Sequence, residues 1–154
     1  MNRGSLSKKI LLFVCLFLVI SCRVMLIGAY DPITDQSIQK IQNDVSSLIV
    51  QIEKNLFNGN TTANKFENFT ISYSDIEGQL QSLKIRCNAL PKYQLVVDQL
   101  TAFDSTIRRL EKFHSIGFTP GDTGSIRIIR QTLEFDFKQM IILQNGLKRK
   151  SGSE

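Results

Sequence analysis

The sequence predicts an all-α protein, an up-down-up-down antiparallel four-helix bundle that follows a cleaved N-terminal signal segment. Three observations lead to this fold class. Apolar residues recur every three or four positions along four separate stretches, which is the spacing of one buried helix face. Glycine, proline and asparagine cluster between these stretches, where helices end. The 154 residues are 42% hydrophobic and 21% charged, a composition typical of one globular domain.

The first helix is expected to begin at Asp31-Pro32 and to run for about 25 residues. Aspartate favours the N-cap position, and proline favours the first helical position that follows it. The turn-forming residues 58–62 end the helix. Its apolar face consists of Ile38, Ile41, Val45, Leu48, Ile49, Ile52 and Leu56.

The second and third helices are expected on either side of Pro91, which ends one and can start the other. The second starts near Ser72 or Ser74, after a short segment with Phe66, Phe69 and Ile71 that covers the bundle end. Its face consists of Tyr73, Ile76, Leu80, Leu83, Cys87 and Leu90. The face of the third consists of Val96, Leu100, Phe103, Ile107, Leu110 and His114, with Leu95 and Phe113 beside it.

The fourth helix follows the breaker segment 117–124, with Asp122 or Thr123 as its cap. Its face consists of Ile126, Ile129, Leu133, Phe137, Met140, Leu143 and Leu147. Phe135, Ile141 and Ile142 lie off this face, so we expect the helix to be covered on more than one side. The basic residues 148–150 complement the dipole at the helix C-terminus.

The first thirty residues differ from the rest of the chain. Arg3, Lys8 and Lys9 precede the uninterrupted apolar run 10–20. This order of charge and apolar core is typical of a secretory signal, and the run is too short to cross a bilayer. It ends at Ser21-Cys22.

Val19-Ile20-Ser21-Cys22 resembles the lipobox of bacterial lipoproteins, although Ile20 is bulkier than the usual residue and Val19 replaces the commoner leucine. The resemblance implies that signal peptidase II cuts between Ser21 and Cys22 and that Cys22 carries a diacylglyceryl thioether. The chain then divides into a signal peptide (1–21), a lipidated linker (22–30), a helical bundle domain (31–150) and a disordered tail (151–154). The bundle is similar to small uncharacterised helical lipoproteins of bacterial envelopes.

Two other interpretations of the N-terminus stay open. An uncleaved helix over residues 10–29 would span the membrane but would place Arg23 beyond its middle, where a charge is costly. Ordinary signal peptidase could instead cut after Gly28 or Ala29. With the lipid anchor, the protein belongs to the bacterial envelope, facing the periplasm or exposed at the surface. By analogy with enterobacterial sorting, Arg23 after the cysteine favours the outer membrane if the envelope is Gram-negative.

The sequence therefore predicts a non-catalytic lipoprotein, an interaction or structural module for another envelope protein. We expect no cofactor and no small-molecule substrate. Without residues 1–21 the net charge falls from +5 to +2, so nucleic acid is not expected as a partner. One alternative is an accessory subunit of a secretion, conjugation or transport machine, held by the uncleaved helix.

Two groups of residues are candidate sites. Tyr30, Asp31, Thr34, Asp35 and Gln36 lie beside the lipid attachment and could form a partner face, or simply cap the first helix.

Glu111 and His114 have the Glu-x-x-His spacing that di-iron bundle proteins use twice. The chain has one histidine, so His114 is expected in the core at a helix end, and a metal-binding bundle enzyme is the third hypothesis. Cys87 is expected to be a buried thiol; a disulfide with Cys22 requires that Cys22 carry no lipid.

Overall fold

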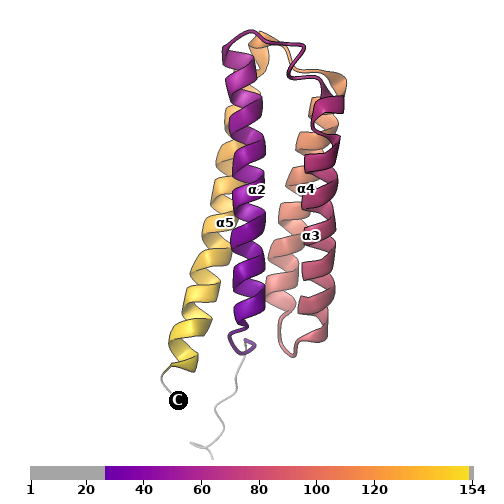
Figure 1. The fold of residues 1–154 in the computed structure, drawn as a ribbon. Coiled ribbons are helices and arrows are strands. Elements are labelled where there is room, and N and C mark those ends of the chain that lie inside the picture. Colours follow the sequence, from indigo (N-terminus) through magenta and orange to yellow (C-terminus); the bar gives the residue numbers. More distant parts are fainter. Residues whose placement is uncertain (1–26, 153–154) are drawn as a thin grey trace, which may run out of the picture.

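The computed structural model describes residues 27–152. Four long helices account for most of this part: α2 (Pro32–Phe57), α3 (Thr70–Ala89), α4 (Gln94–Ile116) and α5 (Thr123–Ser151). Two short 3-10 helices, η1 (Phe66–Asn68) and η2 (Pro120–Asp122), lie in the connections. Successive helices run in opposite directions, and each packs against two neighbours (Figure 1). The predicted all-α four-helix architecture is confirmed, with no strand within residues 27–152.

The first helix forms as its sequence predicts. Asp31 is the N-cap of α2, and its side chain accepts a hydrogen bond from the Thr34 backbone N–H. Pro32 occupies the first turn, where its missing N–H costs nothing. The seven predicted apolar residues of this helix are all buried.

The boundaries of α3 and α4 differ from those expected. α3 begins at Thr70, earlier than Ser72, and Ile71 is 76% exposed, so the prediction that Ile71 covers the bundle end is wrong. Phe69 does cover that end and is fully buried. α4 begins at Gln94 and not at Pro91, because Lys92 has a left-handed φ of 62° that cannot continue into a helix.

Asp122 precedes α5 as predicted, but its side chain does not cap that helix. The carboxylate instead accepts hydrogen bonds from the backbone N–H and the hydroxyl of Thr119, each at 2.7 Å. These bonds belong to a capping box at the start of η2. α5 continues through Ser151, which corrects the expected tail; residues 153–154 lie outside the described part.

The outer face of α5 is exposed. Phe135 and Ile142 are exposed, and Ile141 is half-buried. The expectation that α5 is covered on more than one side is therefore wrong at Phe135 and Ile142. The physical reason is the packing: α5 has α2 and α4 as its long-helix neighbours, and its third side faces solvent. At the α4–α5 contact, the rings of Phe103 and Phe137 are 4.5 Å apart between centroids.

The bundle has two different ends. We call the end that holds residues 27–34, the α3–α4 turn and the last turn of α5 the base, and the opposite end, with residues 57–70 and 114–123, the distal end. The start of the described chain and the C-terminal end of α5 both lie at the base (Figure 1). None of the helices within residues 27–152 has the length and apolarity needed to span a membrane.

Candidate functional site at the base of the bundle

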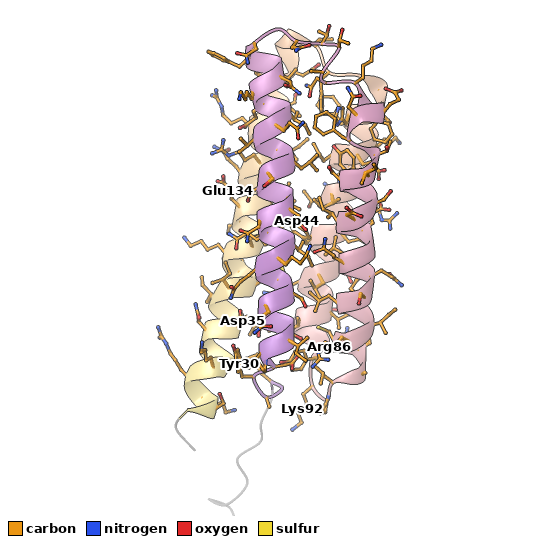
Figure 2. The ribbon with its side chains drawn as sticks, viewed as in Figure 1. Tyr30, Asp35, Asp44, Arg86, Lys92 and Glu134 are labelled. Carbon is orange, nitrogen blue, oxygen red and sulfur yellow. The ribbon has the colours of Figure 1, made fainter. Side chains whose placement is uncertain are left out.

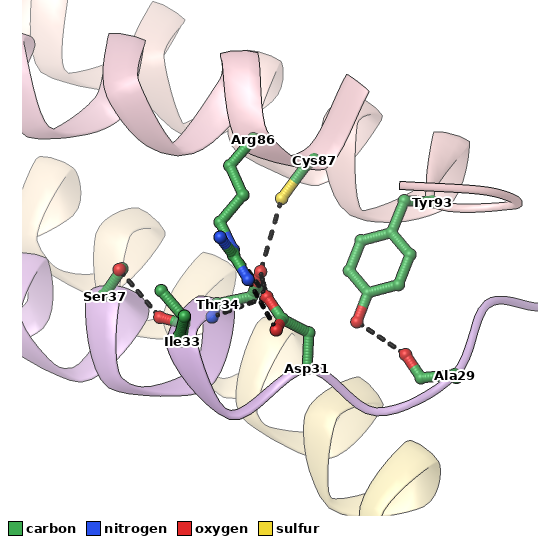
Figure 3. Close-up of polar contacts among 8 residues, drawn as sticks. All are labelled: Ala29, Asp31, Ile33, Thr34, Ser37, Arg86, Cys87 and Tyr93. Atoms are coloured by element: carbon green, nitrogen blue, oxygen red, sulfur yellow. Dashed lines mark hydrogen bonds and ion pairs between the residues drawn. The ribbon is translucent and has the colours of Figure 1, made fainter. Parts of the chain in front are cut away.

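Residues 27–31, here called the basal strap, connect the N-terminal side of the chain to the bundle. The Gly28 N–H donates to the Lys92 carbonyl at 3.0 Å. The Tyr93 hydroxyl donates to the Ala29 carbonyl at 2.7 Å (Figure 3). The Tyr93 side chain is buried, and burial raises its pKa to about 12. These bonds hold the strap against the α3–α4 turn.

Glycine is required at position 28 of the strap. A Cβ atom there would meet the Tyr93 ring and would lie 2.8 Å from the Pro91 carbonyl oxygen. Both neighbours belong to the α3–α4 turn, and the Tyr93 side chain is buried and bonded to Ala29. Gly28 therefore allows the close approach of two backbones.

Asp31 joins three parts of the base. Its carboxylate accepts from the Thr34 N–H at 3.0 Å and from the Thr34 hydroxyl at 2.6 Å. It also accepts hydrogen bonds from Nε and Nη2 of Arg86 on α3, at 2.7 and 2.8 Å, and so forms a bidentate ion pair (Figure 3). The Arg86 guanidinium holds the pKa of Asp31 well below its usual range, helped by Thr34. Asp31 is thus a cap for α2 and a clamp on α3.

Cys87 lies directly behind this ion pair. Its Sγ atom is 3.8 Å from the Thr34 hydroxyl, and both side chains are buried. Burial raises the pKa of the Cys87 thiol, which keeps it protonated and unreactive at neutral pH. The expected buried free thiol is confirmed, while Cys22 lies outside the described residues.

The last turn of α5 also reaches the strap. The Tyr30 hydroxyl donates to Asp35 at 2.8 Å, and this bond raises the pKa of Tyr30. The Lys148 ammonium stands 5.7 Å from the centre of the Tyr30 ring, within cation–π range. Figure 2 shows Tyr30, Asp35, Arg86 and Lys92 together at this end.

The structure brings four of the five predicted partner-face residues into internal contacts. Thr34 is fully buried, and the carboxylates of Asp31 and Asp35 have partners within the chain. Gln36 is exposed. The cap interpretation therefore accounts for Asp31 and Thr34, and binding of a partner by this group stays a prediction.

Sequence reasoning missed three residues that build the base: Arg86, Lys92 and Tyr93. Arg86 lies just before the buried Cys87, at the edge of the apolar face of α3, so its position beside α2 was indicated but its partner was not. Nothing in the pattern around Pro91 indicates that the Tyr93 hydroxyl donates to the carbonyl of Ala29 in the strap.

The other candidate, His114, lies at the distal end and is fully buried. Its Nε2 atom is 2.8 Å from the Asn64 carbonyl oxygen, which can only accept, so Nε2 carries the proton. Nδ1 therefore accepts from the Tyr73 hydroxyl at 3.0 Å. The Phe118 ring stacks on the imidazole at 4.4 Å. Burial lowers the pKa of His114, which favours the neutral imidazole. The predicted place of His114 in the core at a helix end is confirmed.

Glu111 and His114 do not form a ligand pair. Both ring nitrogens of His114 already have partners, and burial together with Glu77 raises the pKa of Glu111. Within residues 27–152, no group of three or more histidine, cysteine, aspartate or glutamate side chains could hold a metal ion. Of the two residues, His114 packs in the core, while Glu111 is half-buried.

An open groove of about 930 Å³ runs between α2 and α3. In its wall, Asp44 accepts from Lys40 at 2.8 Å and from Gln79 at 2.7 Å, which lowers the pKa of Asp44. Its lining holds neither histidine nor cysteine, so it presents no nucleophile with an imidazole base.

The described geometry is therefore that of a bundle tied together at its base. Comparison with protein-family models, with curated proteins and with solved structures found no match for this chain.

Proposed function

We propose that the protein is a membrane-tethered, non-catalytic helical bundle that presents its distal end to another protein of a bacterial envelope. The observation that carries the proposal is the fixed basal strap. Gly28 and Ala29 are bonded to the α3–α4 turn, so a pull or a tether on the N-terminal side acts on the rigid bundle.

The tether that we propose is lipid on Cys22. Four residues separate Cys22 from Ile27, and a chain of this length reaches at most about 18 Å. Lipid at Cys22 would therefore keep the base close to the membrane surface. Two or three acyl chains suffice for lasting attachment, since each buried methylene contributes about 0.8 kcal/mol.

The distal end offers apolar surface for a partner. Phe57 at the end of α2 is 89% exposed, and Ile71 and Ile116 are each 76% exposed. All three lie in or beside the connections at that end, and α5 alone spans about 43 Å at 1.5 Å per residue. Exposed apolar side chains at this end could be buried by a partner that docks there.

Incorporation of labelled palmitate tests the tether. We expect the wild-type chain and the Cys15→Ser variant to incorporate label, since Cys15 would leave with the signal peptide. Cys22→Ser should incorporate none. Incorporation that persists in Cys22→Ser would contradict the proposed anchor.

Photo-crosslinking in the native host tests the distal contact. A photoreactive residue at Phe57 or Ile116 should give one discrete adduct. The same residue at Phe135, which is exposed midway along α5, is the matched control and should give none. Equal adducts from Phe57 and Phe135 would show that the distal end has no special partner.

A further inference from the structure

We propose that the base is itself a binding surface for anionic lipid headgroups, so that the bundle stands upright on the membrane. This inference rests on the proposed function, since the tether brings the base to the lipid surface. It adds that protein and lipid make a direct, charge-dependent contact there.

Basic residues from two separate elements gather at the base. Lys92 is exposed in the α3–α4 turn, and Lys148 and Arg149 are exposed in the last turn of α5. Residues 87–97 and 137–152 contain no aspartate or glutamate. The positive charge of these segments is therefore not offset by acids in the same segments.

Two acids lie near these basic residues. Asp31 is paired with Arg86 at two points, while Asp35 accepts from the neutral Tyr30 hydroxyl and keeps its negative charge. Lys92, Lys148 and Arg149 outnumber that charge, so the described part of the base presents net positive charge to the phosphate groups of anionic lipids. The distal end differs, since its residues 57–70 and 114–123 hold Lys65 together with Glu67 and Asp122.

The helix dipole explains only part of this arrangement. Cations in the last turn of α5 stabilise that helix, but Lys92 lies outside any helix. Its φ of 62° is a conformation that glycine or asparagine adopts more cheaply. The chain thus carries an exposed lysine at a strained turn that faces the same way as the end of α5 (Figures 1 and 2).

Apolar side chains accompany the charges. Ile33 and Leu95, the second residues of α2 and α4, are both about half exposed at the base. Binding at a membrane interface grows with apolar area and with attraction of basic residues to anionic lipid. The base offers both.

Hydrogen–deuterium exchange of the full chain in vesicles tests the contact. One set of vesicles holds phosphatidylcholine alone, and the other also holds phosphatidylglycerol. On the anionic vesicles we expect amides of residues 90–95 and 148–152 to exchange several-fold more slowly than on the neutral ones. High salt should remove the difference, and residues 58–65 at the distal end should not change. Equal exchange on the two kinds of vesicle would overturn the inference.

A charge-reversal pair with a matched control separates local contact from net charge. Lys148→Glu with Arg149→Glu should abolish the protection on anionic vesicles. Arg127→Glu with Lys138→Glu makes the same change in net charge on the same helix, further from the base, and should keep the protection. Both control side chains are exposed. Loss of protection in both pairs would also overturn the inference, as it would indicate attraction by overall charge.

Flotation of the wild-type chain with the same vesicles separates this inference from the proposed tether. A chain that floats with neutral vesicles, but shows no added protection on anionic ones, keeps its tether and contradicts the basal contact. A chain that floats only with anionic vesicles, in a salt-sensitive way, supports the basal contact and contradicts the tether.

Discussion

Asp31 stabilises the base in two ways, because its one carboxylate both caps α2 and forms an ion pair with Arg86. Its partners are Thr34 on its own helix and Arg86 on α3. The side chain of Arg86 is 36% exposed, so solvent screens the ion pair and keeps its contribution modest.

Replacement of Asp31 by alanine is expected to lower the free energy of unfolding by about 2–3 kcal/mol. About 1 kcal/mol comes from the lost cap, and the rest from the charge-assisted hydrogen bonds to Arg86. Urea unfolding at neutral pH measures the loss. Asp35→Ala is the matched control, since it removes a carboxylate from the same helix end without removing the cap, and it should cost less than about 1 kcal/mol. Equal losses would contradict the role assigned to Asp31.

His114 makes stability depend on pH. Its pKa is lowered by burial, below the value of about 6.5 in an unfolded chain. As the pH falls through 6.5, the unfolded chain gains a proton that the folded protein does not, so stability decreases toward the lower folded pKa.

The prediction is a wild-type free energy of unfolding that declines from pH 7.5 to pH 5.5. Urea titrations across this range should show a flatter profile for His114→Gln, which removes the titrating group, even if that variant is less stable throughout. Parallel profiles for the two proteins would mean that His114 is not the titrating group.

The burial of Cys87 and His114 could be predicted because both lie on the apolar face of their helices. The ion pair between Asp31 and Arg86 could not. These residues are 55 positions apart in the sequence. Their contact depends on the axial offset between α2 and α3, which the spacing of apolar residues does not determine.

At the scale of elements, the basal strap needs a glycine for close packing, whereas the helix α3 has room for a side chain at its glycine. Gly28 has the Tyr93 ring and the Pro91 carbonyl where a Cβ would go. Gly78 lies inside α3, and a Cβ there would meet nothing within 4 Å. The same substitution should therefore have opposite effects at the two positions.

Gly28→Ala is expected to detach the strap, seen as faster hydrogen exchange at the Gly28 position and in residues 90–93, and to lower stability. Gly78→Ala should raise the free energy of unfolding by about 0.5–1 kcal/mol, since alanine loses less conformational freedom in a helix. Slower unfolding and unchanged exchange in Gly28→Ala would show that the strap is not closely packed.

Helix centres could be predicted better than helix ends. The apolar face of α2 and its Asp31-Pro32 start were both correct. The starts of α3 and α4 were not, because Thr70 and Gln94 carry no strong cap signal: neither helix has a side-chain cap. On α5, hydrophobicity alone does not predict that Phe135 is exposed, because its burial depends on how many helices pack around α5.

For the whole molecule, four apolar faces and short connections were enough to predict the bundle. The function is harder to derive, because a bundle stabilised by its own core needs no reactive residue. What the structure adds is an asymmetry between the two ends. The base holds the strap and the basic residues, while the distal end exposes Phe57, Ile71 and Ile116.

The central claim is that lipid on Cys22, on the N-terminal side of the strap, anchors this bundle to a membrane. The mass of the N-terminal peptide tests this claim most directly. The protein would be purified from the membranes of its native host and digested. We predict that the first peptide begins at Cys22 and carries a diacylglyceryl group. A peptide with residues 10–29 intact, or one that begins at Cys22 with a free thiol, would contradict the account.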